Sequence, residues 1–365
     1  MYQQTDAVKP RFNKANQPDF FRVLNQRVDQ YFRDNQLSKK ANWNMVFKTT
    51  FMVSLYFIPF ILMITGLFAT FWSAMAMWAL MGLGMAGIGL CVMHDANHGA
   101  YSKDRWVNKA VGFIINFMGS FHGMWKIQHN VLHHSYTNIH GFDEDTDNEV
   151  MRFSPEQQHR FIYRFQAFYA PFFYCLMSLN RFLIKDFKQV FSFKKAGLLK
   201  GEGLTFGSAL AQMLFHKTWY VLLTIGLPTY LLDLSLGQVL IGFLMMHFIC
   251  GIILALIFQS AHIIEETDFF VAGEDGNMEN NWAIHQVKTT ANFANTNALF
   301  SWFIGGLNFQ IEHHLFPNIC HVHYRHLSKI VRATTQEYQL PYHQHTTFFG
   351  ALRSHFVRLH QLGQA

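Results

Sequence analysis

Three short stretches of the sequence place histidines at spacings that suit metal binding. They read HDANH (94–98), HNVLHH (129–134) and QIEHH (310–314). In the first two, histidines four residues apart would lie on one face of a helix, about one turn apart. Imidazole is a common ligand of first-row transition metals, and a buried histidine without a partner costs free energy. The three stretches therefore predict a metal site.

The predicted ligands are numerous enough for two ions. His262 follows a long apolar run that ends at residue 258. In the same way, HDANH directly follows an apolar run that ends at residue 93. Imidazole ligands without sulfur suit iron, copper, zinc or nickel. The predicted ligands are His94, His98, His129, His133, His134, His262, His313 and His314. Gln310, Asp95, Asn97 and Glu312 are candidates for a further ligand or for partners of the imidazoles.

Other histidines are expected to lie outside the site. His247 precedes His262 by roughly 22 Å along a helix, at 1.5 Å per residue, which is too far to join the cluster. His321, His323 and His326 follow the third motif in a predicted helical tail, where we expect them on the surface.

The elements that must position these histidines are predicted to cross a membrane. Half of the residues are hydrophobic and only 14% are charged, against roughly one quarter in soluble domains. Four apolar runs have about the 20 residues that a transmembrane helix needs. They cover residues 49–71, 74–93, 212–232 and 239–258. The runs pair into two hairpins, and each hairpin leads directly into histidines.

The distribution of positive charge predicts the orientation in the membrane. Lys and Arg lie before the first run, between the second and third runs, and after the fourth, and neither hairpin turn contains one. By the positive-inside rule, both termini and the histidines are cytoplasmic. The predicted fold is thus an all-α integral membrane protein, with four transmembrane helices in two hairpins and a cytoplasmic helical cap that holds the metals. The sequence has a net charge of +6 but no dense run of Lys and Arg. This pattern argues against a nucleic-acid-binding protein and favours a lipid bilayer as partner.

The three motifs together resemble the histidine boxes of the integral-membrane fatty acid desaturases. Glutamine at position 310 within GGLNFQIEHHLFP is similar to the front-end subgroup, which commonly acts at Δ5 or Δ6. The resemblance covers residues 45–345 and includes DEDTDNEVMRFSP after the second box and QVKTTANFA before the third. It implies a fatty acyl substrate, dioxygen as co-substrate, and two ferrous ions held by the eight histidines, with Gln310 at a position where many relatives have a ligand histidine.

The resemblance also implies domains and an electron donor. We expect an amphipathic N-terminal segment (1–44), a desaturase domain (45–345) and a C-terminal tail (346–365). In the first, a helix over 19–37 would place an apolar face on the membrane surface. The HPGG haem motif of relatives with a fused cytochrome b5 domain does not occur in this sequence. An external donor is therefore expected, either a ferredoxin or a cytochrome b5 with its reductase, at a bacterial inner membrane or an ER-type membrane.

Alternatives remain at this stage. A hydroxylase or ketolase on the same scaffold would carry similar boxes. A histidine-rich metal transporter would need histidines inside the spans, where only His247 and His216 lie. The residues leave open the double-bond position, the chain length, and whether the acyl group is carried on CoA, a carrier protein or a glycerolipid.

Overall fold

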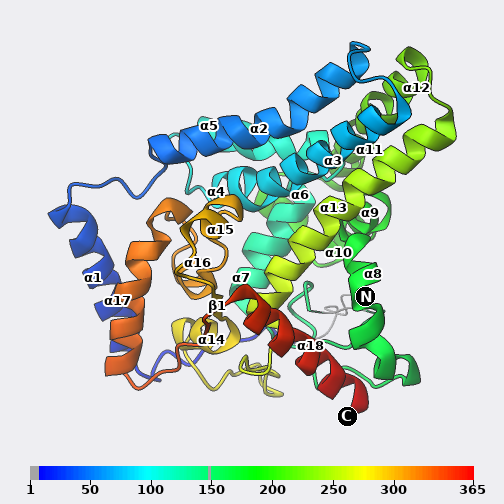
Figure 1. The fold of residues 1–365 in the computed structure, drawn as a ribbon. Coiled ribbons are helices and arrows are strands. Elements are labelled where there is room, and N and C mark those ends of the chain that lie inside the picture. Colours follow the sequence, from blue (N-terminus) through cyan, green and yellow to red (C-terminus); the bar gives the residue numbers. More distant parts are fainter. Residues whose placement is uncertain (1–7, 147–148) are drawn as a thin grey trace.

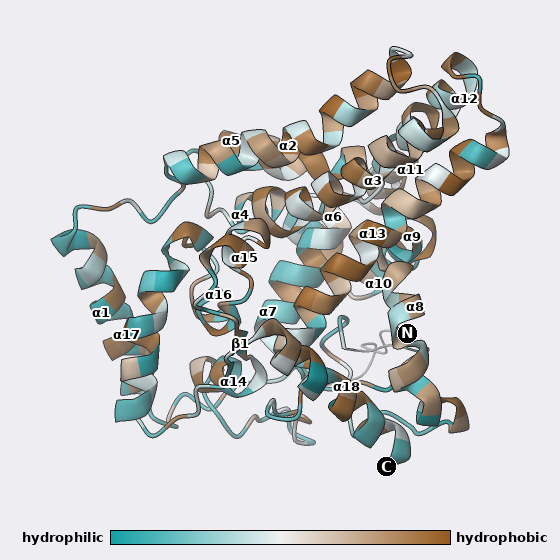
Figure 2. Ribbon diagram, viewed as in Figure 1, coloured by the Kyte–Doolittle hydropathy of each residue, from teal (hydrophilic) through white to brown (hydrophobic). Residues whose placement is uncertain are grey.

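Long apolar helices dominate one end of the computed structural model, which describes residues 8–146 and 149–365 (Figure 1). Within these residues, three helices are long and apolar enough to cross a membrane. They are α2 (Trp43–Ile64), the continuous helix formed by α3 (Phe71–Gly87), η1 (Ile88–Val92) and α4 (Met93–Asn97), and α13 (Leu236–His262). Hydrophobic residues predominate along these helices, whereas hydrophilic residues are frequent in the segments around α14 (Figure 2).

The first two predicted spans form adjacent helices whose boundaries differ from the prediction. The connection lies at residues 65–70, and not at Trp72 and Ser73 as predicted. Gly66 has a φ of +81°, in the left-handed region that favours glycine, and its N–H donates to the Met63 carbonyl. The helix therefore stops before the apolar stretch of sequence ends.

The third predicted span is not among the three qualifying helices. Residues 206–231 form α11 (Phe206–Val221), η7 (Leu222–Gly226) and α12 (Leu227–Leu231), and they include Lys217. The buried Nζ of Lys217 lies 2.9 Å from an Asp186 carboxylate oxygen. A fourth span exists if the helix pair over 161–175 and 177–195, bent by 65°, counts as one. The prediction of four spans is thus supported only as three to four.

Close helix packing holds α3 between α2 and α13. Gly242 of α13 lies against the Trp78 ring, where an added Cβ would be 2.1 Å from a ring carbon. Gly84 of α3 approaches the backbone of α2 in the same way, with Tyr56 N only 2.6 Å from an added Cβ. Small residues at such crossings let helix backbones approach closely, as is typical of membrane helices.

The N-terminal amphipathic helix packs on the protein and not on a membrane surface. It forms α1 (Asp19–Asp34) and lies beside α17 (Tyr324–Glu337) (Figure 1). Its apolar face is buried in a core shared with α17 and α16. This face consists of Phe20, Leu24, Val28 and Phe32. The helix was predicted correctly, but its surface location was wrong because periodicity does not identify what covers an apolar face. Residues 1–7 of the predicted segment lie outside the described residues.

Short elements complete the cap. β1 (Asn292–Phe293) pairs in parallel with β2 (Gln344–His345). The remaining elements are α5 (Arg105–Gly112), η2 (Phe113–Met118), α6 (His122–Lys126), η3 (Ile127–His133), α7 (His134–Tyr136), η4 (Phe161–Phe165), α8 (Gln166–Cys175), α9 (Met177–Asn180), η5 (Arg181–Lys185), α10 (Asp186–Lys195), η6 (Leu198–Glu202), α14 (Trp282–Thr289), α15 (Ala298–Phe303), α16 (Gln310–Leu315), η8 (His321–His323) and α18 (Phe348–Gln364).

Candidate metal centre

The eight predicted ligand histidines converge from the ends of helices that are far apart in sequence. His94 lies in α4, and His98 directly follows it. The second motif occupies η3 and the start of α7, the third lies in α16, and His262 is the last residue of α13. His98 is partly buried and the other seven are buried. The structure therefore brings together every histidine that the sequence singled out.

Two of the three motifs adjoin π-helical turns. One such turn, η1, immediately precedes α4, and the second motif lies largely inside η3. A π turn contains more residues than an α turn, and such turns are frequent at functional sites. Within η3, the rings of His129 and His133 stack at 5.3 Å and 21°. The sequence predicted the histidine spacing but not this widening of the helix.

The ring nitrogens fall into two adjacent groups. In the first group, nitrogens of four histidines all lie within 4.8 Å of one another. These are His94, His98, His129 and His313. The second group consists of His133, His262 and His314, within the same limit. Imidazole nitrogens lie about 2 Å from a bound first-row metal, so nitrogens that share an ion lie within about 4 Å of each other. Small side-chain rotations would suffice for each group to close on one ion.

His134 lies between the two groups. Its Nε2 is 3.3 Å from the Nε2 of His129, and its ring stacks on that of His314 at 4.3 Å. It also forms a possible metal-binding set with His313 and His314, one from each group. The groups are therefore neighbours, as a two-metal centre requires.

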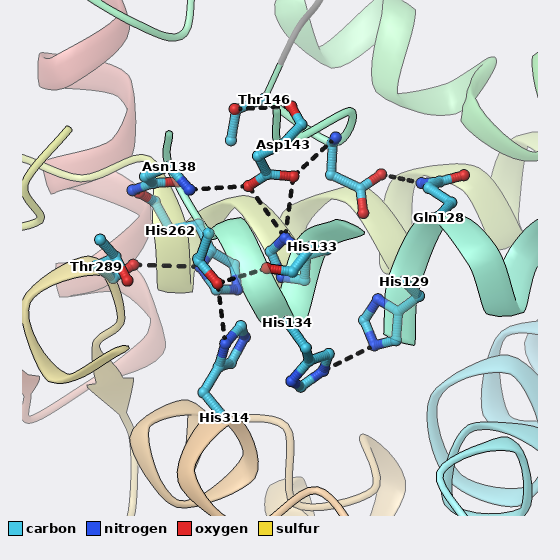
Figure 3. Close-up of polar contacts among 12 residues, drawn as sticks. Gln128, His129, His133, His134, Asn138, Asp143, Thr146, His262, Thr289 and His314 are labelled. Atoms are coloured by element: carbon cyan, nitrogen blue, oxygen red, sulfur yellow. Dashed lines mark hydrogen bonds and ion pairs between the residues drawn. The ribbon is translucent and has the colours of Figure 1, made fainter. Parts of the chain in front are cut away.

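In the second group, the Nδ1 atom of each ring faces an acceptor, and Figure 3 shows those of His133 and His262. His133 Nδ1 lies 3.1 Å from an Asp143 carboxylate oxygen, and His262 Nδ1 lies 3.3 Å from the Thr289 carbonyl. His314 Nδ1 lies 2.8 Å from Gln286 Oε1. Acceptors at Nδ1 place the proton there and leave the Nε2 lone pair for a metal.

Several ring nitrogens that face the groups have no hydrogen-bond partner among the described residues. They are the Nε2 atoms of His98, His133, His313 and His314. Buried polar atoms in native proteins almost always have a partner, and leaving one unsatisfied costs about 1–3 kcal/mol. A metal at each group would satisfy these atoms. The donor set thus fits two first-row transition metals.

Burial keeps most of these rings neutral. It lowers the pKa of His129, His134 and His314, and charge repulsion from neighbouring histidines lowers these pKa values further. Neutral imidazole is the form that binds metal. For His133, burial also lowers the pKa, but the Asp143 carboxylate more than offsets this effect and raises it. Asp143 therefore makes His133 the more basic ligand.

Asp143 provides a testable link between the loop after the second motif and the metals. Its carboxylate also accepts the backbone N–H groups of Asn138 and Asp145. We expect Asp143→Asn, which keeps the shape but removes the charge, to weaken metal binding about 10- to 100-fold. The metal affinity of the purified variant measures this effect. Asp233→Asn, at an exposed position between α12 and α13, is the control and should leave the metal affinity unchanged. A wild-type metal affinity in Asp143→Asn would exclude the role.

Gln310 faces the second group. Its Nε2 lies 2.9 Å from His262 Nε2, and its Oε1 is buried without a partner among the described residues. A 180° rotation of the amide would exchange these two atoms. Either atom can therefore lie toward the second group, and the oxygen has the lone pairs that a ligand needs.

The other three candidate polar residues do not join the clusters. Asn97 donates to the Gly112 carbonyl. Glu312 is fully buried and accepts hydrogen bonds from Asn292 (2.9 Å) and Tyr342 (3.0 Å), away from the rings. Burial raises the pKa of Glu312 to about 7. Its role here is to fasten α16 to β1 and to the segment before β2.

Asp95 belongs to a buried chain of polar contacts behind His94. One of its oxygens lies 3.9 Å from His94 Nδ1, and the other lies 2.9 Å from His321 Nδ1. The Nε2 of His321 lies 2.6 Å from the Nζ of Lys48 in α2. Since an ammonium group can only donate, His321 Nε2 accepts and its Nδ1–H donates to Asp95.

These contacts correct the expectation for the histidines after the third motif. His321 and His323 are buried, at 5% and 6% exposure, and only His326 is exposed. The expected surface location of His321 and His323 was wrong. His247 contacts Ser178 and Tyr220, away from the clusters, as expected.

The residues that hold the imidazoles were not predicted individually. Asp143 belongs to DEDTDNEV, and Gln286 and Thr289 belong to QVKTTANFA. Tyr324, whose hydroxyl lies 3.2 Å from His313 Nδ1, belongs to neither stretch. The two stretches were recognised only as parts of a resemblance, and that resemblance was the available signal.

An apolar cavity borders the first imidazole group. His94, His129 and Gln310 form part of its wall, together with Trp125. Most of the remaining wall is hydrophobic. These residues include Met85, Leu90, Met93, Ile115, Met118, Leu254 and Ile257. The cavity thus suits a hydrocarbon chain that passes beside the metals.

Comparison with known proteins agrees with this geometry. The family model "Fatty acid desaturase" matches residues 70–346. The chain is 37% identical to "sn-1 linoleoyl-lipid 6-desaturase" of Synechocystis sp., over 95% of this chain and 96% of that protein. It is 34% identical to "Acyl-lipid (8-3)-desaturase" of Physcomitrium patens, over 96% of this chain and 72% of that protein. It is 27% identical to "Delta(5) fatty acid desaturase A" of Dictyostelium discoideum, over 97% and 76%.

A helical protein with buried histidine groups beside an apolar cavity and these similarities is a membrane-type lipid-modifying oxidoreductase. The chain belongs to the fatty acid desaturase family. The predicted family and enzyme class are confirmed.

Proposed function

We propose that this protein is a front-end acyl-lipid desaturase that uses dioxygen and a di-iron centre. The observation that carries the proposal is the pair of adjacent buried imidazole groups, the first of which lines an apolar cavity. The names of its relatives support a lipid-linked acyl substrate and a double bond near the carboxyl end, at Δ5 or Δ6.

The two imidazole groups are the proposed iron ligands. The first group would hold one ion and the second group the other, with His134 between them. Two bound iron ions would allow dioxygen to act as the oxidant that removes hydrogen from an unactivated methylene, chemistry that no side-chain acid, base or nucleophile provides.

The chain's own contribution is to position the substrate. Met93, Leu254 and Ile257 line the cavity close to the histidines and would hold the methylenes in register with the metals. Trp125 packs against the rings of His94 and His129 at 5.8 and 4.6 Å. Holding two adjacent carbons at a fixed place limits the reaction to one bond, and the apolar wall excludes water.

Product analysis tests the proposed function against a hydroxylase or ketolase. The chain would be expressed in a host and supplied with linoleoyl lipid. We expect a new double bond between the existing ones and the carboxyl end, detected by mass spectrometry of the fatty acids. His314→Ala is the inactive control. A new hydroxyl or keto group, with no new double bond, would establish the alternative reaction. A metal transporter is disfavoured, because the imidazole groups gather where helices end and His247 is bonded to neighbouring side chains.

Substitutions of Gln310 test whether this residue binds iron directly or only contacts the ligand His262. We expect Gln310→His to keep the iron, since imidazole is a better iron ligand than an amide. Gln310→Leu should lower turnover about tenfold or more while it retains most of the iron, because the amide contact to His262 is lost. Iron content and turnover are measured together on both variants. Complete loss of iron in Gln310→Leu would instead make Gln310 a direct ligand.

The proposed orientation places both termini and the metal centre on the cytoplasmic side of a bacterial inner membrane or an ER-type membrane. The distribution of Lys and Arg supports this orientation. The proposed desaturase domain covers residues 45–345, between the N-terminal segment (1–44) and the tail (346–365).

A further inference from the structure

We propose that Arg181, positioned by Gln128, binds the ester carbonyl of the lipid-linked acyl chain and thereby fixes the double bond at a set distance from the carboxyl end. This inference rests on the proposed function and names the part of the same cavity that recognises the polar end of the substrate. Besides the histidines and Gln310, the wall of this cavity has a strongly polar part formed by Arg181, Gln128 and Asp145.

The polar part of the wall is a connected set of side chains. Arg181, Gln128 and Asp145 all line the cavity. Arg181 donates to Gln128 Oε1, and Gln128 Nε2 donates to Asp145. Arg181 Nη1 also lies 3.0 Å from Asp186 Oδ1. The set is therefore held rigidly, as a recognition site requires.

Arg181 retains donors for a ligand. A guanidinium carries five N–H groups, and its bonds to Gln128 and Asp186 do not use all of them. The side chain is 14% exposed and borders the cavity. An acyl ester presents a carbonyl oxygen, which is an acceptor only. The two groups are complementary, and a hydrogen bond from a charged donor is stronger than one from a neutral donor.

The cations around Arg181 already have carboxylate partners. Asp186 pairs with Arg181 and with Lys217. Asp145 lies beside Gln128 and pairs with Lys185 at 3.3 Å. Arg181 therefore offers a ligand only its remaining N–H groups, and the carbonyl oxygen of a neutral ester can accept a hydrogen bond from them.

The location of the polar set agrees with a double bond near the carboxyl end. Gln128 directly precedes His129, a member of the first imidazole group. Both residues belong to η3 and both line the cavity. An ester bound to Arg181 beside Gln128 would therefore direct the first carbons of the acyl chain toward His129. The remaining chain can continue along the apolar wall past Leu254 and Met85. In this arrangement, the position of the double bond is set by its distance from the carboxyl end, and the length of the chain toward the methyl end can vary.

The test compares double-bond positions in the iron-loaded, full-length protein with a purified electron donor. The substrates are synthetic glycerolipids that carry chains of 16, 18 and 20 carbons. Mass spectrometry locates the new bond, and KM and iron content are measured in parallel. The variants are Arg181→Met and, as a matched control, Lys185→Met, which removes a positive charge from the same cluster at a residue that does not line the cavity.

We expect the wild-type protein and Lys185→Met to place the bond at one distance from the carboxyl end for all three chains. Arg181→Met should give a mixture of neighbouring positions and about a tenfold higher KM, the effect of one lost charge-assisted hydrogen bond, with unchanged iron. If Arg181→Met loses its iron, Arg181→Lys decides, since it keeps the charge but lacks the forked donor.

A single unchanged isomer with unchanged KM in the decisive Arg181 variant would overturn the inference. A wild-type bond that keeps a constant distance from the methyl end would overturn the front-end part of the proposed function, and the inference with it. A wild-type protein that binds iron, accepts electrons and forms no double bond would instead overturn the proposed function.

Discussion

Replacement of His314 by alanine is expected to remove most of the iron and to lower desaturation more than about 100-fold, beyond the 10- to 100-fold effect of losing an outer partner of a ligand. The reason lies in its position. Its nitrogen belongs to the second group with His133 and His262, and also to the set with His134 and His313. One substitution therefore weakens both metal positions, while the membrane helices should still insert. His133→Ala should have a similar effect.

Iron per protein and product formation measure this result, and size-exclusion chromatography confirms that the variant remains folded. His326→Ala is the matched control, because His326 belongs to the same C-terminal part of the chain but is exposed. It should keep full iron and activity. Full activity in His314→Ala would remove His314 from the ligand set.

Omission of an external electron donor should abolish turnover. In the proposed reaction, each double bond consumes one dioxygen, whose reduction to water takes four electrons, and the substrate supplies only two. The printed sequence shows no haem, flavin or iron–sulfur motif, and its four cysteines are free thiols. The proposed source of the other two electrons is a ferredoxin or a cytochrome b5 with its reductase.

Rates should also fall as ionic strength rises. The chain carries a net charge of +6, and an acidic donor would be steered toward it by long-range attraction that salt screens. The assay uses purified protein and NAD(P)H, with and without donor proteins, across a series of salt concentrations. Sustained turnover without a donor would refute the requirement. Turnover that needs a donor but does not change with salt would support the donor requirement and exclude electrostatic steering.

The membrane helices show how far the sequence alone predicts the fold. The runs that became α2, α3 and α13 were recognised because apolar length is a local property. The run over 212–232 was predicted to span the membrane, but its helices do not qualify as a span. Lys217 in this run pairs with Asp186 on a different helix, a contact that the local pattern does not indicate. The apolar face of α1 was recognised, but α17, which covers it, is distant in sequence. Local patterns predict an element, whereas long-range contacts decide its neighbours.

The candidate site shows the same division between local patterns and long-range contacts. The ligand histidines were found because motif spacing is visible in the sequence. Their partners come from loops and from α14, which the fold brings to the rings, and no spacing rule joins Asp143 to His133 or Gln286 to His314. The π turns were equally invisible, since they depend on how the helices pack.

The distribution of ligands between the two groups constrains when the metal centre can form in the cell. α16 supplies His313 to the first group and His314 to the second, so neither group is complete before residue 314 has been synthesised. By then the ribosome has already released α2, α3 and α13 for insertion into the bilayer. Loading of the proposed iron ions would therefore be a late event in biogenesis, after the spans are in place, and a chain that ends before α16 would occupy the membrane without a complete site for either ion.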